Sequence, residues 1–178
     1  YRQDFGRLNT VQDNYGIPRS KSIKTTPAHQ LALAAVYYSP LQYMYWYDKP
    51  SDSQDEPELK FFDDVYTTWD DTKVLQGEVG EFITVARRKG EEWFIGSITN
   101  NEARNLPVDL SFLPKNTNYI AEIYTDGSPS IPTRTKVKVS KYRIKNPTIL
   151  NFHLKASGGS AVRLVPEKEK ETSVRTYK

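Results

Sequence analysis

Short apolar runs alternate with turn-forming residues along the second part of the chain, from about Lys73 onward. The first two runs, residues 81–88 and 92–98, flank a turn at Lys89-Gly90, which predicts a β-hairpin. Five further runs of the same kind cover residues 104–112, 118–124, 135–139, 148–154 and 161–164. Seven or so short strands at roughly ten-residue spacing are typical of an antiparallel β-sandwich or barrel.

One long helix is predicted ahead of these strands, over residues 27–38. Thr26 is a suitable N-cap, and Pro27 fits the first helical position. After Gln30 the segment is apolar nearly all round, until Ser39-Pro40 ends it. Such a helix is buried on more than one side, as between a sheet and a neighbouring domain.

The region around this helix predicts a piece of an α/β unit. A strand-like segment follows over residues 41–47, which makes the αβ step of an α/β layer or barrel. A short amphipathic helix is predicted over residues 58–65. The chain then divides into an α/β fragment (residues 1–72), the sandwich (73–165) and a tail (166–178). The tail alternates charge and lacks an apolar face, so we expect it to be disordered.

Composition excludes several classes of protein. The absence of cysteine removes disulfides, Cys-ligated zinc, iron–sulfur clusters and thiol nucleophiles. The net charge of +3 is small and the basic residues are scattered, so we expect no nucleic-acid partner. No apolar run approaches the ~20 residues of a membrane helix, so we expect no membrane span. Because the chain starts at Tyr1 and no signal-type segment follows, we expect a trimmed chain or the C-terminal part of a longer protein.

The candidates for carboxylate chemistry are Asp48, Asp63, Asp64, Asp70 and Asp71. A two-carboxylate mechanism needs two such groups roughly 5–10 Å apart in a pocket. Neighbouring aspartates point in different directions, so neither adjacent pair is a ready-made site, and roles in loops and helix caps are favoured. Asp48 differs because it ends the strand predicted after the helix, and in a β/α barrel this end lies on the active-site face. Asp48 is therefore a candidate for substrate binding.

An aromatic run of Tyr43, Tyr45, Trp46 and Tyr47 lies in the same predicted strand. Flat aromatic rings can pack against sugar rings, which makes a substrate contact one interpretation. However, one side of the strand must pack against the apolar helix, so core packing is favoured for most of these residues. Alternation places Trp46 on the side opposite the three tyrosines, and it is the second candidate for substrate binding.

The two histidines, His29 and His153, are far apart in the sequence and have no evident Ser or carboxylate partner. A structural hydrogen bond is the favoured role for His29, and a His-dependent hydrolase or a multi-His metal site is disfavoured. The Asp-x-Asp-x-Asp-Gly pattern of calcium loops is absent. On residue chemistry alone, the chain holds no complete catalytic site.

Several segments resemble glycoside hydrolase family 97. Its late-barrel region is similar to residues 24–33 (Lys24-Thr25-Thr26-Pro27-Ala28-His29 and onward), 37–42 (Tyr37-Tyr38-Ser39-Pro40-Leu41-Gln42) and 61–78 (Phe61-Phe62-Asp63-Asp64-Val65 and onward). The start of its C-terminal β-domain is similar to residues 82–88 and 93–100. The resemblance covers roughly residues 21–165 and is strongest between His29 and Asn101.

The resemblance implies a mainly β fold: a C-terminal antiparallel β-sandwich preceded, over residues 1–72, by the last α/β elements of a (β/α)8 barrel. Family members are α-glucosidases and α-galactosidases, mostly of Bacteroidota, with an N-terminal β-domain and a calcium ion near the catalytic carboxylates. Those carboxylates and the calcium ligands lie upstream, so no catalytic or metal residue is assigned here and the isolated chain is expected to be inactive.

The implied partners are the upstream barrel, the N-terminal β-domain and an oligosaccharide substrate, and the implied location is periplasmic or secreted. The alternative from another class is a stand-alone β-sandwich module that binds carbohydrate or protein without catalysis.

Overall fold

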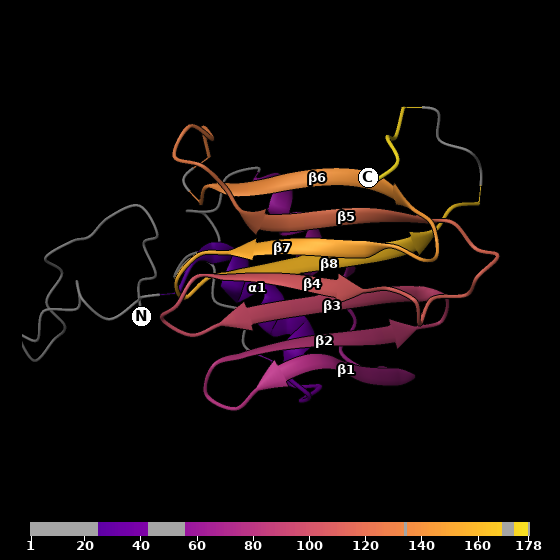
Figure 1. Cartoon of the computed structure of the whole chain (residues 1–178), viewed down its shortest axis with the longest axis horizontal. Coiled ribbons are helices and arrows are strands. Elements are labelled where there is room, and N and C mark those ends of the chain that lie inside the picture. Colours follow the sequence, from indigo (N-terminus) through magenta and orange to yellow (C-terminus); the bar gives the residue numbers. More distant parts are fainter. Residues whose placement is uncertain (1–24, 43–55, 134, 169–172, 178) are drawn as a thin grey trace, which may run out of the picture.

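The computed structural model describes residues 25–42, 56–133, 135–168 and 173–177 (Figure 1). These residues form two antiparallel sheets, one of six strands in the order β1-β2-β3-β8-β5-β6 and one of two strands, β4-β7. The small sheet packs on one face of the large sheet, and helix α1 packs on the other (Figure 1). The strands are β1 (Asp71–Glu78), β2 (Phe82–Lys89), β3 (Glu92–Thr99), β4 (Arg104–Asp109), β5 (Tyr119–Asp126), β6 (Val137–Ile144), β7 (Ile149–Leu154) and β8 (Gly159–Pro166). The predicted mainly β fold with an antiparallel sandwich is confirmed.

The helices are α1 (Pro27–Val36), the 3-10 turn η2 (Pro57–Leu59) and α2 (Lys60–Asp64). They lie where the sequence predicts helices, although α1 ends two residues earlier than expected. Leu41 and Gln42 are not in a strand, and the rest of the strand predicted over 41–47 lies outside the described residues. Because no strand precedes β1 in the described part, the assignment of residues 1–72 to a barrel stays a prediction.

Strand β1 is the strand that the sequence does not reveal. It lies at the edge of the large sheet, pairs only with β2 and contains a bulge between Val74 and Gln76. An edge strand buries little surface, so its residues are mostly polar and give no apolar run. Such a strand is fixed by its hairpin partner and not by its own hydrophobicity.

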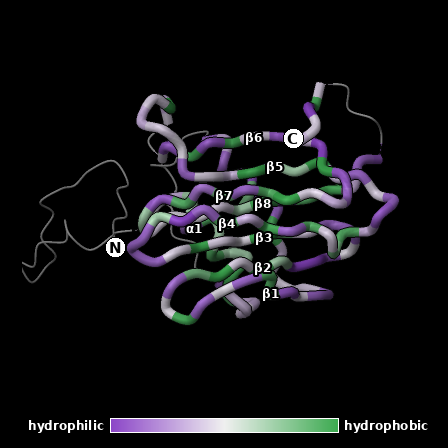
Figure 2. Tube along the Cα trace, in the orientation of Figure 1, coloured by the Kyte–Doolittle hydropathy of each residue, from purple (hydrophilic) through white to green (hydrophobic). Residues whose placement is uncertain are grey.

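The first core lies between the two sheets. It is built by alternate residues of each strand, such as Trp93 and Ile95 of β3 and Leu164 of β8, which face Leu150 and Phe152 of β7. Figure 2 shows apolar residues recurring along the strands and hydrophilic residues in most of the connections between them. Because Phe94 of β3 belongs to a second core on the opposite face, the central strands are buried on both sides.

The second core lies between α1 and the large sheet. The side chain of Thr26 accepts a hydrogen bond from the His29 backbone N–H at 3.2 Å, and Pro27 occupies the first turn, as predicted. At the other end, the Gln42 side-chain amide donates to the carbonyl oxygens of Ala34 and Tyr37 at 3.2 and 3.3 Å, which satisfies the end of the helix. The predicted packing of this helix against a sheet is confirmed.

Two glycines allow α1 to lie directly on the strands. A Cβ atom on Gly96 of β3 would lie 2.4 Å from the carbonyl oxygen of Ala32. A Cβ atom on Gly159 of β8 would lie 2.6 Å from the Cα atom of His29. The helix contributes small side chains at the same contacts, so its backbone approaches the sheet more closely than ordinary side chains permit.

The expectation of a disordered tail over residues 166–178 is wrong for residues 173–177. Backbone hydrogen bonds join Arg143 of β6 to Arg175 and Tyr177, at 2.8 and 3.0 Å. The Arg143 guanidinium binds Glu167 in a two-pronged ion pair, with Nη2 and Oε1 2.6 Å apart, and Nη1 donates to the Val174 carbonyl at 3.2 Å. An isolated β-bridge and one charge-assisted pair hold these residues, together with the buried side chain of Val174 and the packing of Tyr177 against the first core.

No helix in the described part of the chain is long and apolar enough to cross a membrane.

Candidate interaction surface

Trp46 and Asp48 lie outside the described residues, so their roles in substrate binding stay predictions. Three of the other aspartates have structural partners: Asp64, in the cluster described below, Asp70 and Asp71. Asp70 accepts hydrogen bonds from the Gly90 backbone N–H at 2.8 Å and from the Lys89 ammonium at 3.1 Å, and both lower the pKa of its carboxyl group. Asp71 forms an ion pair with Lys73 at 3.2 Å. No group of three His, Asp or Glu side chains within the described ranges could hold a metal ion.

The structure keeps the two histidines apart and gives each a structural partner. The Nδ1 atom of His29 lies 3.1 Å from the Gly158 carbonyl oxygen, in a buried position that ties the start of α1 to the residue just before β8. Burial lowers the pKa of His29, so the neutral ring donates this bond. His153 is exposed on β7, and its Nδ1 lies 2.6 Å from Asn105 Oδ1 on β4. The predicted structural role of His29 is confirmed.

An ion-pair cluster holds α2 against the large sheet. The Arg163 guanidinium of β8 donates to Glu92 at 2.9 Å and to Asp64 at 2.6 Å, and it lies 3.7 Å from Glu122. Burial alone would lower the pKa of Arg163, but the three carboxylates outweigh it and raise the pKa. The members come from four elements far apart in the sequence, so no local pattern could have revealed the cluster.

A buried arginine, Arg87, fixes the C-terminal end of α1. The Arg87 guanidinium of β2 donates to the carbonyl oxygens of Ala35 at 2.5 Å and Val36 at 3.0 Å. A cation at this end of a helix also complements its dipole. Burial lowers the pKa of Arg87, and its guanidinium lies 5.5 Å from the ring centre of Tyr38. Because α1 is fixed here, the aromatic residues after it lie at the surface beside β2.

Exposed apolar side chains gather on the face of the large sheet that carries the helices. We call them the helix-side surface: Tyr37, Tyr38, Leu41, Tyr66, Val74 and Val79. The exposed fractions of Tyr38, Leu41 and Val79 are 83%, 73% and 102%. Soluble monomers rarely leave many large apolar side chains exposed on one face, and such patches mark interaction sites.

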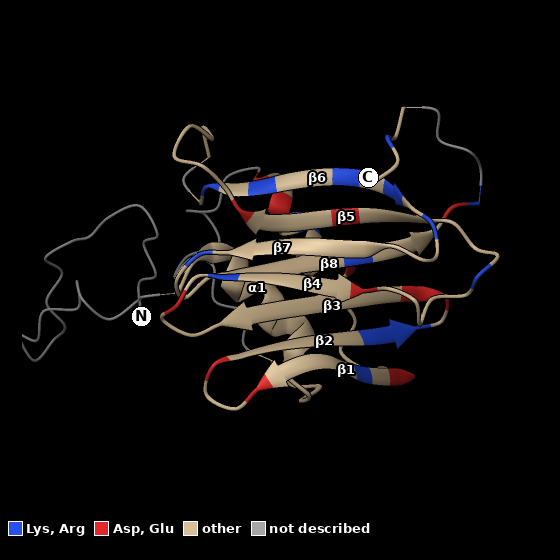
Figure 3. Cartoon of the chain, viewed as in Figure 1, with Lys and Arg blue, Asp and Glu red and all other residues tan. Residues whose placement is uncertain are grey.

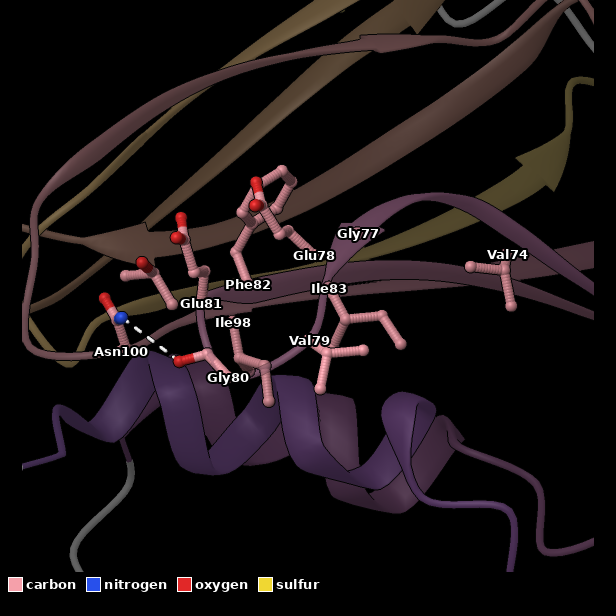
Figure 4. Close-up of a pocket in the computed structure, with 11 residues that line it drawn as sticks. Val74, Gly77, Glu78, Val79, Gly80, Glu81, Phe82, Ile83, Ile98 and Asn100 are labelled. Atoms are coloured by element: carbon pink, nitrogen blue, oxygen red, sulfur yellow. Dashed lines mark hydrogen bonds between the residues drawn. The ribbon is translucent and has the colours of Figure 1, made fainter.

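A groove of about 560 Å³ continues this surface at the end of the β1–β2 hairpin. Figure 4 shows Val79, Ile83 and Ile98 directed toward the helix side, whereas Glu81 and Phe82 point the other way. The Asn100 side chain donates to the Gly80 carbonyl at 3.1 Å and so fixes the turn. The groove is mostly apolar, and of its two carboxylates Glu81 is paired with Arg104 at 2.9 Å, so its character suits contact with another protein surface.

Figure 3 shows Lys and Arg interspersed with Asp and Glu, mostly near strand ends and in connections. No broad field of one sign covers the elements in this view, which agrees with the small net charge of +3.

A buried carboxyl group at Glu58 makes stability depend on pH. Glu58 of η2 is fully buried, and its Oε1 accepts a hydrogen bond from the Thr135 hydroxyl. Burial raises the pKa of Glu58, and the nearby buried Glu56 carboxyl adds to the rise. The stabilising contribution is therefore fully present below the unfolded-state pKa and is lost as the pH rises through the folded-state pKa.

We expect the free energy of unfolding of the unaltered chain to fall as the pH rises above about 4.5, the ordinary pKa of a glutamate. A Glu58→Gln variant keeps a neutral side chain of the same shape, so its stability should fall less over the same range. Urea unfolding of both proteins between about pH 4.5 and 8 measures the difference. Equal pH dependence in the two proteins would show that Glu58 is not the group responsible.

Comparison with known proteins gives similarities of three kinds: to a family model, to a curated protein and to solved structures. A family model described as the C-terminal, oligomerisation domain of glycosyl-hydrolase 97 matches residues 68–165. A retaining alpha-galactosidase of Bacteroides thetaiotaomicron is 37% identical over 151 residues, which are 84% of this chain and 22% of that protein. A solved glycoside hydrolase family 97 enzyme from Pseudoalteromonas sp. strain K8, in complex with acarbose, has a TM-score of 0.72 and 34% identity over 80% of this chain and 23% of its own.

A variant of the same Pseudoalteromonas enzyme in complex with panose gives the same values. The chain thus spans about a fifth of the length of the relatives that it matches.

Proposed function

Because the chain belongs to the C-terminal domain family of glycoside hydrolase family 97, we propose that it works as part of a glycosidase that hydrolyses α-glycosidic bonds of oligosaccharides. The similarity to an enzyme named retaining alpha-galactosidase supports this proposal. Similarity to an enzyme solved with acarbose and with panose supports it too. The substrate class proposed is therefore an α-glucoside or an α-galactoside.

The role proposed for this chain is to support the catalytic barrel through the helix-side surface. The observation that carries this role is the position of α1, which is fixed to the sheet at Gly96 and Gly159 and is followed by the exposed Tyr38 and Leu41. Covering these side chains would remove exposed apolar surface from water, at a gain of roughly 25 cal/mol per Å². Because α1 is held rigidly against the sheet, the helix-side surface would give the barrel a contact surface of fixed position.

On the family resemblance, we propose that the catalytic carboxylates and a calcium ion lie in the parts of the protein upstream of α1. Among the described residues, no group of His, Asp or Glu side chains fits a metal ion. A periplasmic or secreted location is proposed on the same resemblance. Trp46 and Asp48 remain the proposed contacts of this chain with the substrate.

The proposed activity is tested with the whole parent protein in the presence of calcium. We expect it to hydrolyse an aryl α-glucoside or an aryl α-galactoside, and we expect the 178-residue chain alone to hydrolyse neither. A folded parent protein without activity on any such substrate would overturn the proposal. The alternative of a stand-alone binding module is not favoured, because the family match is to a domain of glycoside hydrolases.

A further inference from the structure

A second groove lies between β6 and β7, on the face of the large sheet opposite to α1, and encloses about 300 Å³. It exists because the small sheet has only two strands, β4 and β7, and leaves part of β5 and β6 uncovered (Figure 1). In the β5–β6 register, Ser140 is opposite Ile123 and Lys138 is opposite Thr125. Because Ile123 faces the core between the sheets, Ser140 and Lys138 point to that same side and form the floor of the groove.

Both hydrogen-bond donors and hydrogen-bond acceptors line this groove. One oxygen of Asp126 accepts the backbone N–H groups of Lys155 at 3.2 Å and Gly159 at 3.3 Å, which fixes the carboxylate in place. His153 Nδ1 lies 2.6 Å from Asn105 Oδ1, and this hydrogen bond holds the imidazole beside the groove. Lys138 and Ser140 supply donors from the floor.

Two tyrosine rings, packed edge to face, line one end of the groove. The rings of Tyr142 and Tyr177 have centres 5.4 Å apart and lie at 88° to each other. The Tyr177 hydroxyl accepts the backbone N–H of Asn151 at 3.1 Å, which holds this pair of rings against β7. Both side chains are half-buried and line the groove with flat apolar surface.

We propose that this groove binds a neutral saccharide of one or two sugar rings, as a non-catalytic site on the sandwich. Its single cation, Lys138, is matched by a single anion, Asp126, which disfavours a charged ligand. Its volume lies at the lower end of the range for small-molecule sites. An extended peptide fits less well, because the Tyr177 hydroxyl already occupies a backbone donor of β7 that an added strand would need.

The kind of sugar rests on the proposed function, and the disaccharides maltose and melibiose are the probes for α-glucosides and α-galactosides. Titration of the 178-residue chain, followed by amide chemical shifts, is expected to give saturating shifts that centre on residues 138–142 and 151–153 for at least one probe. Ser140→Trp fills the floor of the groove and should weaken binding at least about tenfold. Lys138→Ala should also weaken sugar binding. This variant provides the test if Ser140→Trp does not fold.

Lys145→Ala is the matched control, because Lys145 is exposed just beyond β6 and does not line the groove. It should leave the affinity unchanged. Absence of saturation with both sugars, or shifts that centre elsewhere, would overturn the proposal. The outcome is independent of hydrolysis, since an inactive parent protein would refute the proposed activity while saturating shifts in this groove would still establish the site.

Discussion

Replacing Gly96 with alanine is expected to lower the free energy of unfolding by about 2–3 kcal/mol. The added Cβ atom would lie 2.4 Å from the carbonyl oxygen of Ala32, which is backbone and cannot rotate away. The helix must therefore shift from the sheet and loosen the second core around Phe94. Urea unfolding followed by circular dichroism measures the loss.

Gly77→Ala is the matched control for this prediction. A Cβ atom on Gly77 would lie 3.2 Å from the Phe82 carbonyl oxygen, at an edge strand that can adjust. Neither Gly77 nor Gly96 has a positive φ, so the two substitutions differ in contact and not in backbone strain. We expect a change within about 1 kcal/mol at Gly77. Equal losses at the two positions would contradict the close approach of α1.

Replacing Arg163 with methionine is expected to lower the free energy of unfolding by about 3 kcal/mol. Methionine keeps most of the side-chain volume but leaves Asp64, Glu92 and Glu122 close together without their shared cation. The Arg163 side chain is only 16% exposed, so water compensates little for the lost interactions. The contact of α2 with β8 should weaken first.

Lys60→Met removes another cation from the same Asp64 carboxylate and is the control. The Lys60 side chain is 53% exposed, and ion pairs of this kind contribute little to stability. We expect a change within about 0.5 kcal/mol. If Lys60→Met costs as much as Arg163→Met, the buried cluster is not the source of the stability.

Local signals in the sequence predict much of this fold. The cap at Thr26 and Pro27 marks the start of α1, and the turn at Gly90 marks the first hairpin, because both depend on neighbouring residues only. The edge strands are less visible. β6 extends to Ile144, five residues beyond the predicted end at 139, since an edge strand can carry alternating polar residues such as Lys141.

The interaction surface and the polar clusters could not be predicted in the same way. The Arg163 cluster joins four elements, and the order of the tail depends on the pairing of Arg143 with Glu167. Such contacts are fixed by the tertiary arrangement and leave no periodic pattern in the sequence. The helix-side surface is also a property of the folded chain, because an exposed Tyr38 and a buried Tyr124 look alike in the sequence.

The most direct test of whether the barrel docks on the helix-side surface compares hydrogen exchange in the 178-residue chain alone and in the whole parent protein. We expect the amides of residues 37–39, 41 and 74–79 to exchange at least about tenfold more slowly in the parent, because the barrel covers them. Amides of residues 138–142, in β6 at the opposite edge of the large sheet, should exchange at equal rates in both. Equal rates at residues 37–39, 41 and 74–79 in the two proteins would contradict the docking of the barrel on the helix-side surface.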